Sequence, residues 1–292
     1  MSDLENESPL EYCDSANMLE EDTNPIVEND YADYITEDLS AYAQRTISFV
    51  KNSAIKLRNA VGKANLFTRH SLPPIKSIVG NKGYADIHQI QVPTMPGFTG
   101  TYAQLANVLE NYKQLLYTIE EYDMRPTLLY LEKLLSDTNL LNSRAPSIDF
   151  NRPRIYRYKP IEFKELRDDI AELFTAHDNI SMRSYGSVFG NLEEFNSTAK
   201  RIGDLYQVYV SSGSINKILE LADRIDATGQ KLYFKYFSDP KQKVAKEVRK
   251  EVATLIRECA IASETLAFYT HIVILANTSF ENIATHLKSK VR

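Results

Sequence analysis

Residues 240–289 read PKQKVAKEVRKEVATLIRECAIASETLAFYTHIVILANTSFENIATHLKS, and this stretch decides the fold class. Its apolar residues recur at alternating intervals of four and three, a pattern that keeps one seam of a helix facing its partners. Asp239 is a good N-cap and Pro240 suits the first helical position. The seam residues are Val248, Val252, Leu255, Cys259, Ala262, Leu266, Tyr269, Val273, Ala276, Phe280, Ile283 and Leu287.

An unbroken helix from Pro240 to Ser289 would be roughly 75 Å long at 1.5 Å per residue. Asn277-Thr278-Ser279 is the place where a break is expected. The other faces of its middle part are apolar too, and a two-stranded coiled coil would leave them in water. These residues are Ile261, Phe268, Ile272, Ile274 and Leu275. We therefore predict a helical bundle in which this helix is central and its ends are free to self-associate.

The rest of the body, residues 101–292, is predicted to be all-α. Apolar residues at helical spacing predict helices over 102–119, 163–177, 188–209 and 215–236, with Gly229 as a weak point. Pro126 starts or kinks a further helix, and a loop follows over 137–160. Only ten glycines occur among 292 residues, which also favours helix over Gly-rich barrels or dinucleotide folds.

Charge is divided into blocks along the N-terminal part. Residues 1–44 hold thirteen Asp or Glu and no Lys or Arg, whereas residues 45–85 hold eight Lys or Arg and no acid. We predict a disordered acidic tail over 1–38, a basic amphipathic helix over 39–70 and a Pro/Gly-rich linker over 71–100, with a short strand near 87–92. Three interpretations of the tail are open. It is a solvated segment, an autoinhibitory segment that folds back on the basic stretch, or a removable propeptide.

Two basic segments are candidate binding sites. In the first, an apolar stripe runs through Ala43, Ile47, Val50, Ala54, Leu57 and Val61, and the cations Arg45, Lys51, Lys56, Arg58 and Lys63 cover the other positions. It suits docking to nucleic acid, an anionic membrane or an acidic partner, or simple packing on the body. The second is a loop with Arg152, Arg154, Tyr156, Arg157, Tyr158 and Lys159. Arg binds phosphate and aromatic rings stack on bases, but the loop equally suits a neighbouring subunit or its own bundle.

Motifs for catalysis are weak, so we expect a protein without enzymatic activity, metal or cofactor. The five histidines have no metal-ligand spacing, and His271 is expected to be a hydrogen-bonded core residue. The segment around Ser187 only superficially resembles a nucleophile elbow. Ser214 is interpreted as a helix cap. Two distant cysteines indicate a reducing compartment, the acidic N-terminus disfavours a signal peptide, and no apolar run is long enough to predict a transmembrane span.

The acidic tail, the basic segment and the heptad-patterned body together resemble virion structural proteins of large tailed bacteriophages, of the internal-head or head-assembly kind. In that family, heads are often trimmed by a prohead protease after Leu/Ile-x-Glu. Leu19-Glu20-Glu21 and Ile35-Thr36-Glu37 match this pattern, so the resemblance implies processing after Glu21 or Glu37. Cutting after Glu37 would remove most of the tail's acids. Three further matches fall inside predicted helices, where cutting would be damaging.

These observations lead to two functional hypotheses. The first is a non-enzymatic virion protein, assembled in the host cytoplasm, that contacts nucleic acid, other virion proteins or copies of itself through its basic segments. The second is a cytoplasmic helical adaptor that binds an anionic membrane or a partner helix through residues 39–67. A helical enzyme whose site assembles from distant residues is a third class, because such a site leaves no local motif.

Overall fold

The computed structural model describes residues 55, 58–59, 74–136, 160–175, 180–211, 214–237 and 246–291. Of these residues 80% are helical, which confirms the predicted helical fold class. The elements are α3 (Ile75–Val79), α4 (Tyr84–Ile87), β1 (Gln91–Pro96), α5 (Tyr102–Asn111), α6 (Leu115–Thr118), η2 (Ile119–Met124), α7 (Arg125–Ser136), α8 (Pro160–Ala171), β2 (Ile180–Ser184), α9 (Tyr185–Val188), α10 (Leu192–Tyr206), η3 (Gln207–Ser211), α11 (Ser214–Leu232), η4 (Tyr233–Phe237) and α12 (Lys246–Val291).

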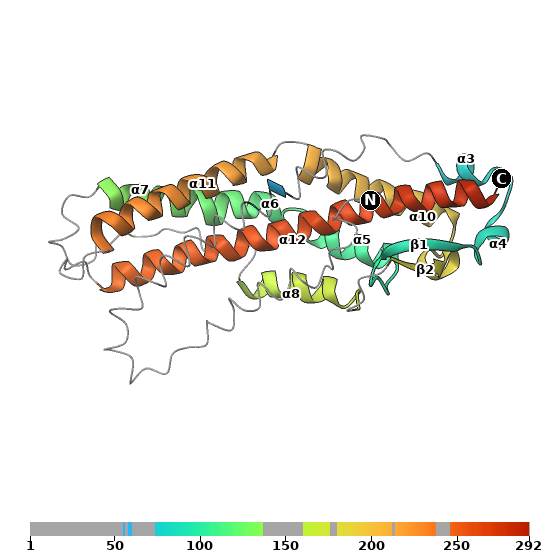
Figure 1. The fold of residues 1–292 in the computed structure, drawn as a ribbon, viewed down its shortest axis with the longest axis horizontal. Coiled ribbons are helices and arrows are strands. Elements are labelled where there is room, and N and C mark those ends of the chain that lie inside the picture. The colour runs from blue at the N-terminus through green and yellow to red at the C-terminus, as the bar shows by residue number, and fades with distance from the viewer. Residues whose placement is uncertain are drawn as a thin grey trace, which may run out of the picture.

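The molecule is elongated, and α12 runs along its length (Figure 1). Helices α7 and α11 lie along the half that holds the N-terminal end of α12, whereas β1, β2 and α10 lie along the half that holds its C-terminal end. Every residue of α12 from Cys259 to Ala276 is buried. The predicted central position of this helix is therefore confirmed, with β1, α10, α3, η2 and α8 among its neighbours.

Helix α12 also passes through residues 277–279 without the break that the sequence suggested. Ser279 is buried, and its hydroxyl forms a hydrogen bond with the hydroxyl of Tyr102 in α5. On the following turn, Phe280 packs against the rings of Tyr102 and Phe189, with centroid distances of 4.9 and 5.6 Å. Contacts of Ser279 and Phe280 with α5 and Phe189 thus hold the helix continuous through the polar triplet.

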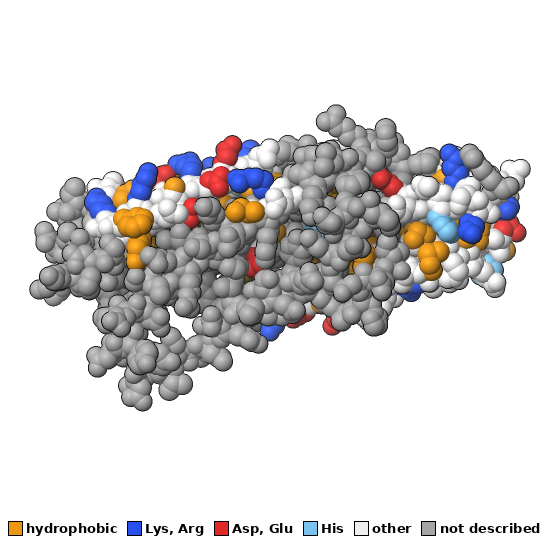
Figure 2. Space-filling model, in the orientation of Figure 1, with side chains coloured by type: hydrophobic (Ala, Val, Ile, Leu, Met, Phe, Trp, Pro, Cys, Tyr) orange, Lys and Arg blue, Asp and Glu red, His pale blue; other side chains and the backbone are white. Residues whose placement is uncertain are grey.

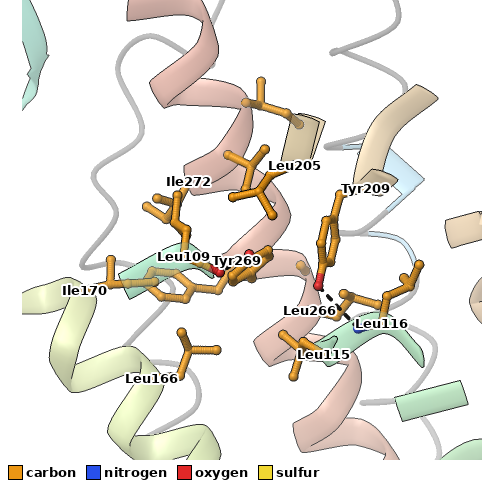
Figure 3. Close-up of a cluster of buried hydrophobic side chains, with 14 of the residues drawn as sticks. Leu109, Leu115, Leu116, Leu166, Ile170, Leu205, Tyr209, Leu266, Tyr269 and Ile272 are labelled. Atoms are coloured by element: carbon orange, nitrogen blue, oxygen red, sulfur yellow. Dashed lines mark hydrogen bonds between the residues drawn. The ribbon is translucent and has the colours of Figure 1, made fainter. Parts of the chain in front are cut away.

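The helix that the sequence predicts over 102–119 is divided in the structure into α5 and α6, although neither Gly nor Pro marks the division. The reason is a buried tyrosine from η3 (Figure 3). The Tyr209 hydroxyl accepts a hydrogen bond from the Leu116 backbone N–H at 3.4 Å, and it lies 3.2 Å from two carbonyl oxygens of the turn, those of Tyr112 and Lys113. Backbone groups that a continuous helix would pair internally are instead bound by this side chain.

A second tyrosine binds the end of α5. The Tyr269 hydroxyl, from α12, donates to the carbonyl of Leu109 at 2.6 Å, and its ring lies 4.6 Å from that of Tyr209. Leu166 and Ile170 of α8 belong to the same buried cluster (Figure 3). The central helix therefore fixes α5 both by apolar packing and by capture of a terminal carbonyl.

Pro126 is the second residue of α7, which agrees with the expectation that it starts or kinks a helix. Proline lacks an N–H, and its ring collides with the carbonyl four residues earlier in a regular helix. The π-helical turn η2 precedes it directly, and the Arg125 N–H reaches back five residues to the Glu120 carbonyl. The wider turn accommodates the proline ring. It also lets the carbonyl of Asp123 accept a hydrogen bond from the buried thiol of Cys259 in α12, at 3.7 Å.

Residues 71–100, predicted to be a linker, are the main correction. From residue 74 onward they form α3, α4 and β1, which pack into the core through six buried apolar side chains. These are Ile75, Val79, Ile87, Val92, Met95 and Phe98. Glycines end α3 and β1, as Gly97 does with a φ of 66° after β1, but the prolines and glycines do not prevent the residues between them from being buried.

The strand expected near 87–92 also lies further along the chain. Helix α4 ends at Ile87, and β1 pairs antiparallel with β2, with Val92 opposite Arg183. The ladder is irregular between Pro93 and Pro96, where the prolines lack the N–H that a regular ladder uses. The partner strand lies about ninety residues away in the sequence, so local pattern could not reveal the pairing.

One helix boundary also differs from the prediction. The helix expected from Val188 begins at Leu192, because the side chain of Asn191 accepts a hydrogen bond from the Glu194 N–H at 2.7 Å and caps it. Helix α11 continues through Gly229, as the predicted helix does, and this glycine is buried. Of the predicted 137–160 loop, only Pro160 lies within the described residues, and there it begins α8.

We predict that Tyr209→Phe destabilises the protein by roughly 1–3 kcal/mol, because it removes the hydroxyl that binds the turn between α5 and α6 while keeping the ring. Tyr117→Phe is the matched control, since the Tyr117 side chain is 54% exposed. Urea unfolding of the two full-length variants measures the difference. Equal midpoints would contradict the role assigned to Tyr209.

Candidate partner-binding surface

Most of the residues that the sequence selects as candidate sites lie outside the described residues. This holds for Arg45, Lys51, Lys56 and Lys63, for the loop residues Arg152, Arg154, Tyr156, Arg157, Tyr158 and Lys159, and for the processing positions Glu21 and Glu37. The tail over 1–38 lies outside them too. Arg58 is the candidate that the structure places, so the site is built outward from it.

Arg58 belongs to a helical part of the basic segment and lies against α11. Its Nη2 is 3.0 Å from Oδ2 of Asp223, and the two side chains are 53% and 58% exposed. An ion pair as exposed as this contributes only about 0–1 kcal/mol to stability. It therefore shows where Arg58 lies but contributes little to holding it there. The contact nevertheless puts a residue of the basic segment on the outer surface of the body.

Two further ion pairs join neighbouring helices on the surface. Arg224 of α11 binds Glu132 of α7 at 2.6 Å. Arg201 of α10 binds Glu110 of α5 at 2.5 Å, and its hydrogen bond to that carboxylate lowers the Glu110 pKa from its ordinary value. Since each pair bridges two helices of the same body, both are best explained as packing contacts.

An exposed apolar and basic surface lies at the α7–α11 end of the molecule. Figure 2 shows hydrophobic side chains flanked by basic ones over these two helices. Leu129 of α7 is 62% exposed and Phe234 of η4 is 70% exposed, and the exposed Lys133 and Lys231 belong to the same helical ends. The helical spacing of Leu128, Leu131 and Leu134 leaves Leu129 on the opposite side of α7, which agrees with its exposure, but the sequence analysis did not single this surface out.

The polar residues in the middle of α12 are enclosed by the bundle. Glu264 and His271 are 1% and 0% exposed, as expected for a core histidine. Arg167 of α8, itself 2% exposed, donates a hydrogen bond from Nη1 to the hydroxyl of Thr265 at 3.1 Å. These groups join α8 to α12 inside the protein. They are part of the packing between the helices and do not open onto a surface.

The serine that the sequence compared with a nucleophile elbow has a local structural role. The Ser187 hydroxyl donates to the Ser184 carbonyl at 2.8 Å, within the short helix α9. Within the residues that the structure describes, no three His, Cys, Asp or Glu side chains are grouped so that they could hold a metal ion.

A small pocket of about 40 Å³, half open to solvent, lies between β1 and α12. It is lined by Pro93, Thr94, Met95, Pro96, Leu275, Thr278, Ser279 and Asn282. Thr94 is 2% exposed, and its hydroxyl donates to the Ser181 carbonyl at 3.0 Å. Because its polar groups largely serve the sheet and α12, the pocket has few that could orient a ligand.

Burial perturbs the pKa values of two tyrosines in the same half of the molecule. Tyr102 is fully buried, and desolvation raises its pKa far above the ordinary value of 10.0, although its hydrogen bond with Ser279 opposes the shift. Desolvation likewise raises the pKa of Tyr185, with a smaller contribution from nearby Tyr84. Both hydroxyls therefore stay protonated in the folded protein at pH values where free tyrosine ionises.

By length and composition, residues Glu258–Val291 of α12 could cross a membrane. The core helix of a water-soluble protein passes the same test, and here the most apolar window of the helix is completely buried inside the protein. The apolar character of α12 is therefore accounted for by packing against the other elements of the chain.

Comparison with protein-family models, with curated proteins and with solved structures finds no match to this chain.

We predict that stability falls steeply above about pH 10, and that Tyr102→Phe makes this fall less steep. A group whose pKa is raised on folding contributes stability that is complete below its unfolded pKa and is lost as the pH rises toward the folded value. Each such tyrosine adds about 1.4 kcal/mol per pH unit to the slope. Urea unfolding at several alkaline pH values measures it, and Tyr117→Phe, at an exposed position, should keep the parent slope.

Proposed function

We propose that the protein is a non-enzymatic structural or assembly protein that contacts a polyanion, and neighbouring subunits, through its basic segments. It would be a virion component of the type found in large tailed bacteriophages, assembled in the host cytoplasm. The observation that carries the proposal is the placement of Arg58, from the basic segment, on the outer surface of the α11 side of the body. A cation there is accessible to a large ligand.

The segregation of charge supports a polyanion as that ligand. Residues 45–85 carry eight Lys or Arg without an acid, and a cluster of cations attracts phosphate backbones whatever their sequence, through release of counterions. The acidic residues in 1–44 have the opposite charge and would compete with the polyanion for the basic segment. Removal of this segment during assembly would then increase binding.

The body supports an assembly role through its shape and its exposed side chains. A rod built around one long helix presents a long lateral surface (Figure 1). Leu129 and Phe234 are exposed on this rod, and large apolar side chains in water are typical of contacts with other molecules. We propose that the α7–α11 end meets another copy or another virion protein.

A cytoplasmic adaptor that binds an anionic membrane is the second candidate. Exposed Phe234 and Leu129 near Lys133 and Lys231 would suit the boundary between lipid headgroups and acyl chains, as would the basic segment 39–67. Co-sedimentation with vesicles that contain phosphatidylserine distinguishes this candidate. Binding to vesicles, together with weak and salt-insensitive binding to DNA, would favour the adaptor.

We predict that the full-length protein binds random-sequence duplex DNA with a strong dependence on salt. Replacing Arg45, Lys51, Lys56 and Lys63 with Gln should weaken binding and should lower the slope of log K against log salt by about 3 to 4, since each lost phosphate contact contributes about 0.9. Fluorescence anisotropy over a salt series gives both quantities.

The matched control replaces Lys200, Lys217, Lys288 and Lys290 with Gln, which removes the same charge from exposed positions on the body. The control should keep most of the parent slope. If both variants lose the same slope, binding comes from net charge and the proposed role of the basic segment is wrong.

Processing is tested separately by peptide mapping of the protein from purified particles. Cleavage after Glu37 would produce chains that begin at Asp38, and cleavage after Glu21 would produce chains that begin at Asp22. Recovery of the intact acidic segment would contradict processing, and absence of the protein from particles would contradict the virion assignment.

A further inference from the structure

Helix α11 has one face that is exposed in every turn. Its exposed residues include Lys217, Glu220, Ala227 and Lys231, whose helical spacing places them on one side of the helix. Phe234 continues this side into η4 and is 70% exposed. Figure 2 shows acidic and basic side chains along the α11 side of the rod. We call the surface of these five residues the α11 face.

The charges of this helix differ in whether they have a partner within the chain. Arg224, at the flank, binds Glu132 of α7 at 2.6 Å. Among the residues that the structure describes, Lys217, Glu220 and Lys231 form no side-chain ion pair or hydrogen bond. The α11 face thus carries an acid and two bases that contacts inside the chain do not explain.

The spacing of these charges makes the α11 face complementary to itself. Residues 220 and 231 are close to three full turns apart, so both lie on one line along the helix, separated by roughly 16 Å. In an antiparallel pair of α11 helices about a two-fold axis, Glu220 of each copy meets Lys231 of the other. The same register brings Lys217 to the ring of Phe234, a favourable cation–π pair. The small Ala227 lies near the axis, where the two helices approach each other most closely.

A parallel pair is disfavoured by the same charges. With the two-fold axis along the helices, each residue would meet its own copy, so Glu220 would face Glu220 and Lys231 would face Lys231. Like charges placed opposite each other cost free energy and exclude that arrangement in favour of the antiparallel one.

Leu129 of α7 widens the apolar part of the surface. It lies three residues before Glu132, and therefore on the side of α7 that contacts Arg224 of α11. Its side chain is 62% exposed. A two-fold contact buries each such side chain twice. Burial of Leu129 and Phe234 therefore contributes most of the stabilisation, whereas the ion pairs mainly set the register.

We propose that the α11 face is the contact between two copies of this chain, packed antiparallel about a two-fold axis, with Glu220 of each copy facing Lys231 of the other. The inference rests on the proposed assembly role, for which it names the partner and the register of the contact.

Zero-length cross-linking of the full-length protein tests the register. A carbodiimide activates the Glu220 carboxyl group, the Lys231 amine attacks it, and an amide forms while the carbodiimide takes up the water as a urea. Within one chain the two residues are separated by roughly 16 Å along a helix, beyond the combined reach of their side chains. After exchange between ¹⁵N-labelled and unlabelled protein, mass spectrometry should find the 220–231 pair with mixed isotopes. Absence of this pair would overturn the contact.

Exchange of charges tests the same contact in solution. Lys231→Glu should weaken the dimer about tenfold or more at low salt, because two attractive pairs become repulsive, and Glu220→Lys should do the same. The double variant carries the exchanged charges and should restore the parent dissociation constant. Lys200→Glu, at an exposed position of α10, is the matched control and should leave it unchanged. Sedimentation velocity over a concentration series measures the constant.

The contact and the proposed function fail in different ways. A parent protein that stays monomeric at every concentration, or a dimer that the single charge reversals leave unchanged, overturns the contact. A double variant that stays as weak as the single variants overturns the antiparallel register. Fluorescence anisotropy with DNA completes the test. A monomer that binds DNA overturns the contact alone, whereas a dimer that follows the charge exchange but binds no DNA supports the contact and overturns the polyanion part of the proposed function.

Discussion

The structure depends on one constraint, which is that the middle of α12, from Cys259 to Ala276, is buried on all its faces and must be covered by other elements. A helix with one apolar stripe can be satisfied by one partner, but between Cys259 and Ala276 each face of α12 requires a neighbour. The chain meets this requirement with β1, α3, α8, α10 and η2, which come from widely separated parts of the sequence. The elongated shape follows, because the covering elements are distributed along a 46-residue helix.

Because short elements cover α12, helix ends and irregular turns lie in contact with the core. Their buried backbone N–H and C=O groups need hydrogen-bond partners there. Side chains from the core helices provide them. Tyr209 and Tyr269 bind backbone groups around the turn after α5, and Cys259 donates to a carbonyl of η2. Side chains of the hydrophobic interior therefore also bind backbone groups of neighbouring elements. Tertiary contacts, and not a glycine or proline, fix the turn after α5.

This use of the interior leaves the surface as the place for contacts with other molecules. The buried polar groups, among them Arg167 and Glu264, are enclosed by the bundle. The surface in turn presents a cation of the basic segment beside α11 and exposed apolar side chains near the ends of α7 and α11. The proposed role as an assembly protein rests on this arrangement together with the charge blocks of the sequence.

The sequence by itself determined the helical class, the long C-terminal helix and its central position, because a four-three rhythm with further apolar residues on the other faces requires neighbours all round. That the helix continues through residues 277–279 was decided by tertiary contacts. The sequence misjudged residues 74–100, since prolines and glycines reveal where elements end and not whether the residues between them are buried. The break after α5 could not be predicted either. It depends on Tyr209, which lies about a hundred residues further along the chain. Only the tertiary structure decided that Arg58 faces Asp223, because an ion pair between distant segments leaves no periodic signal in either of them.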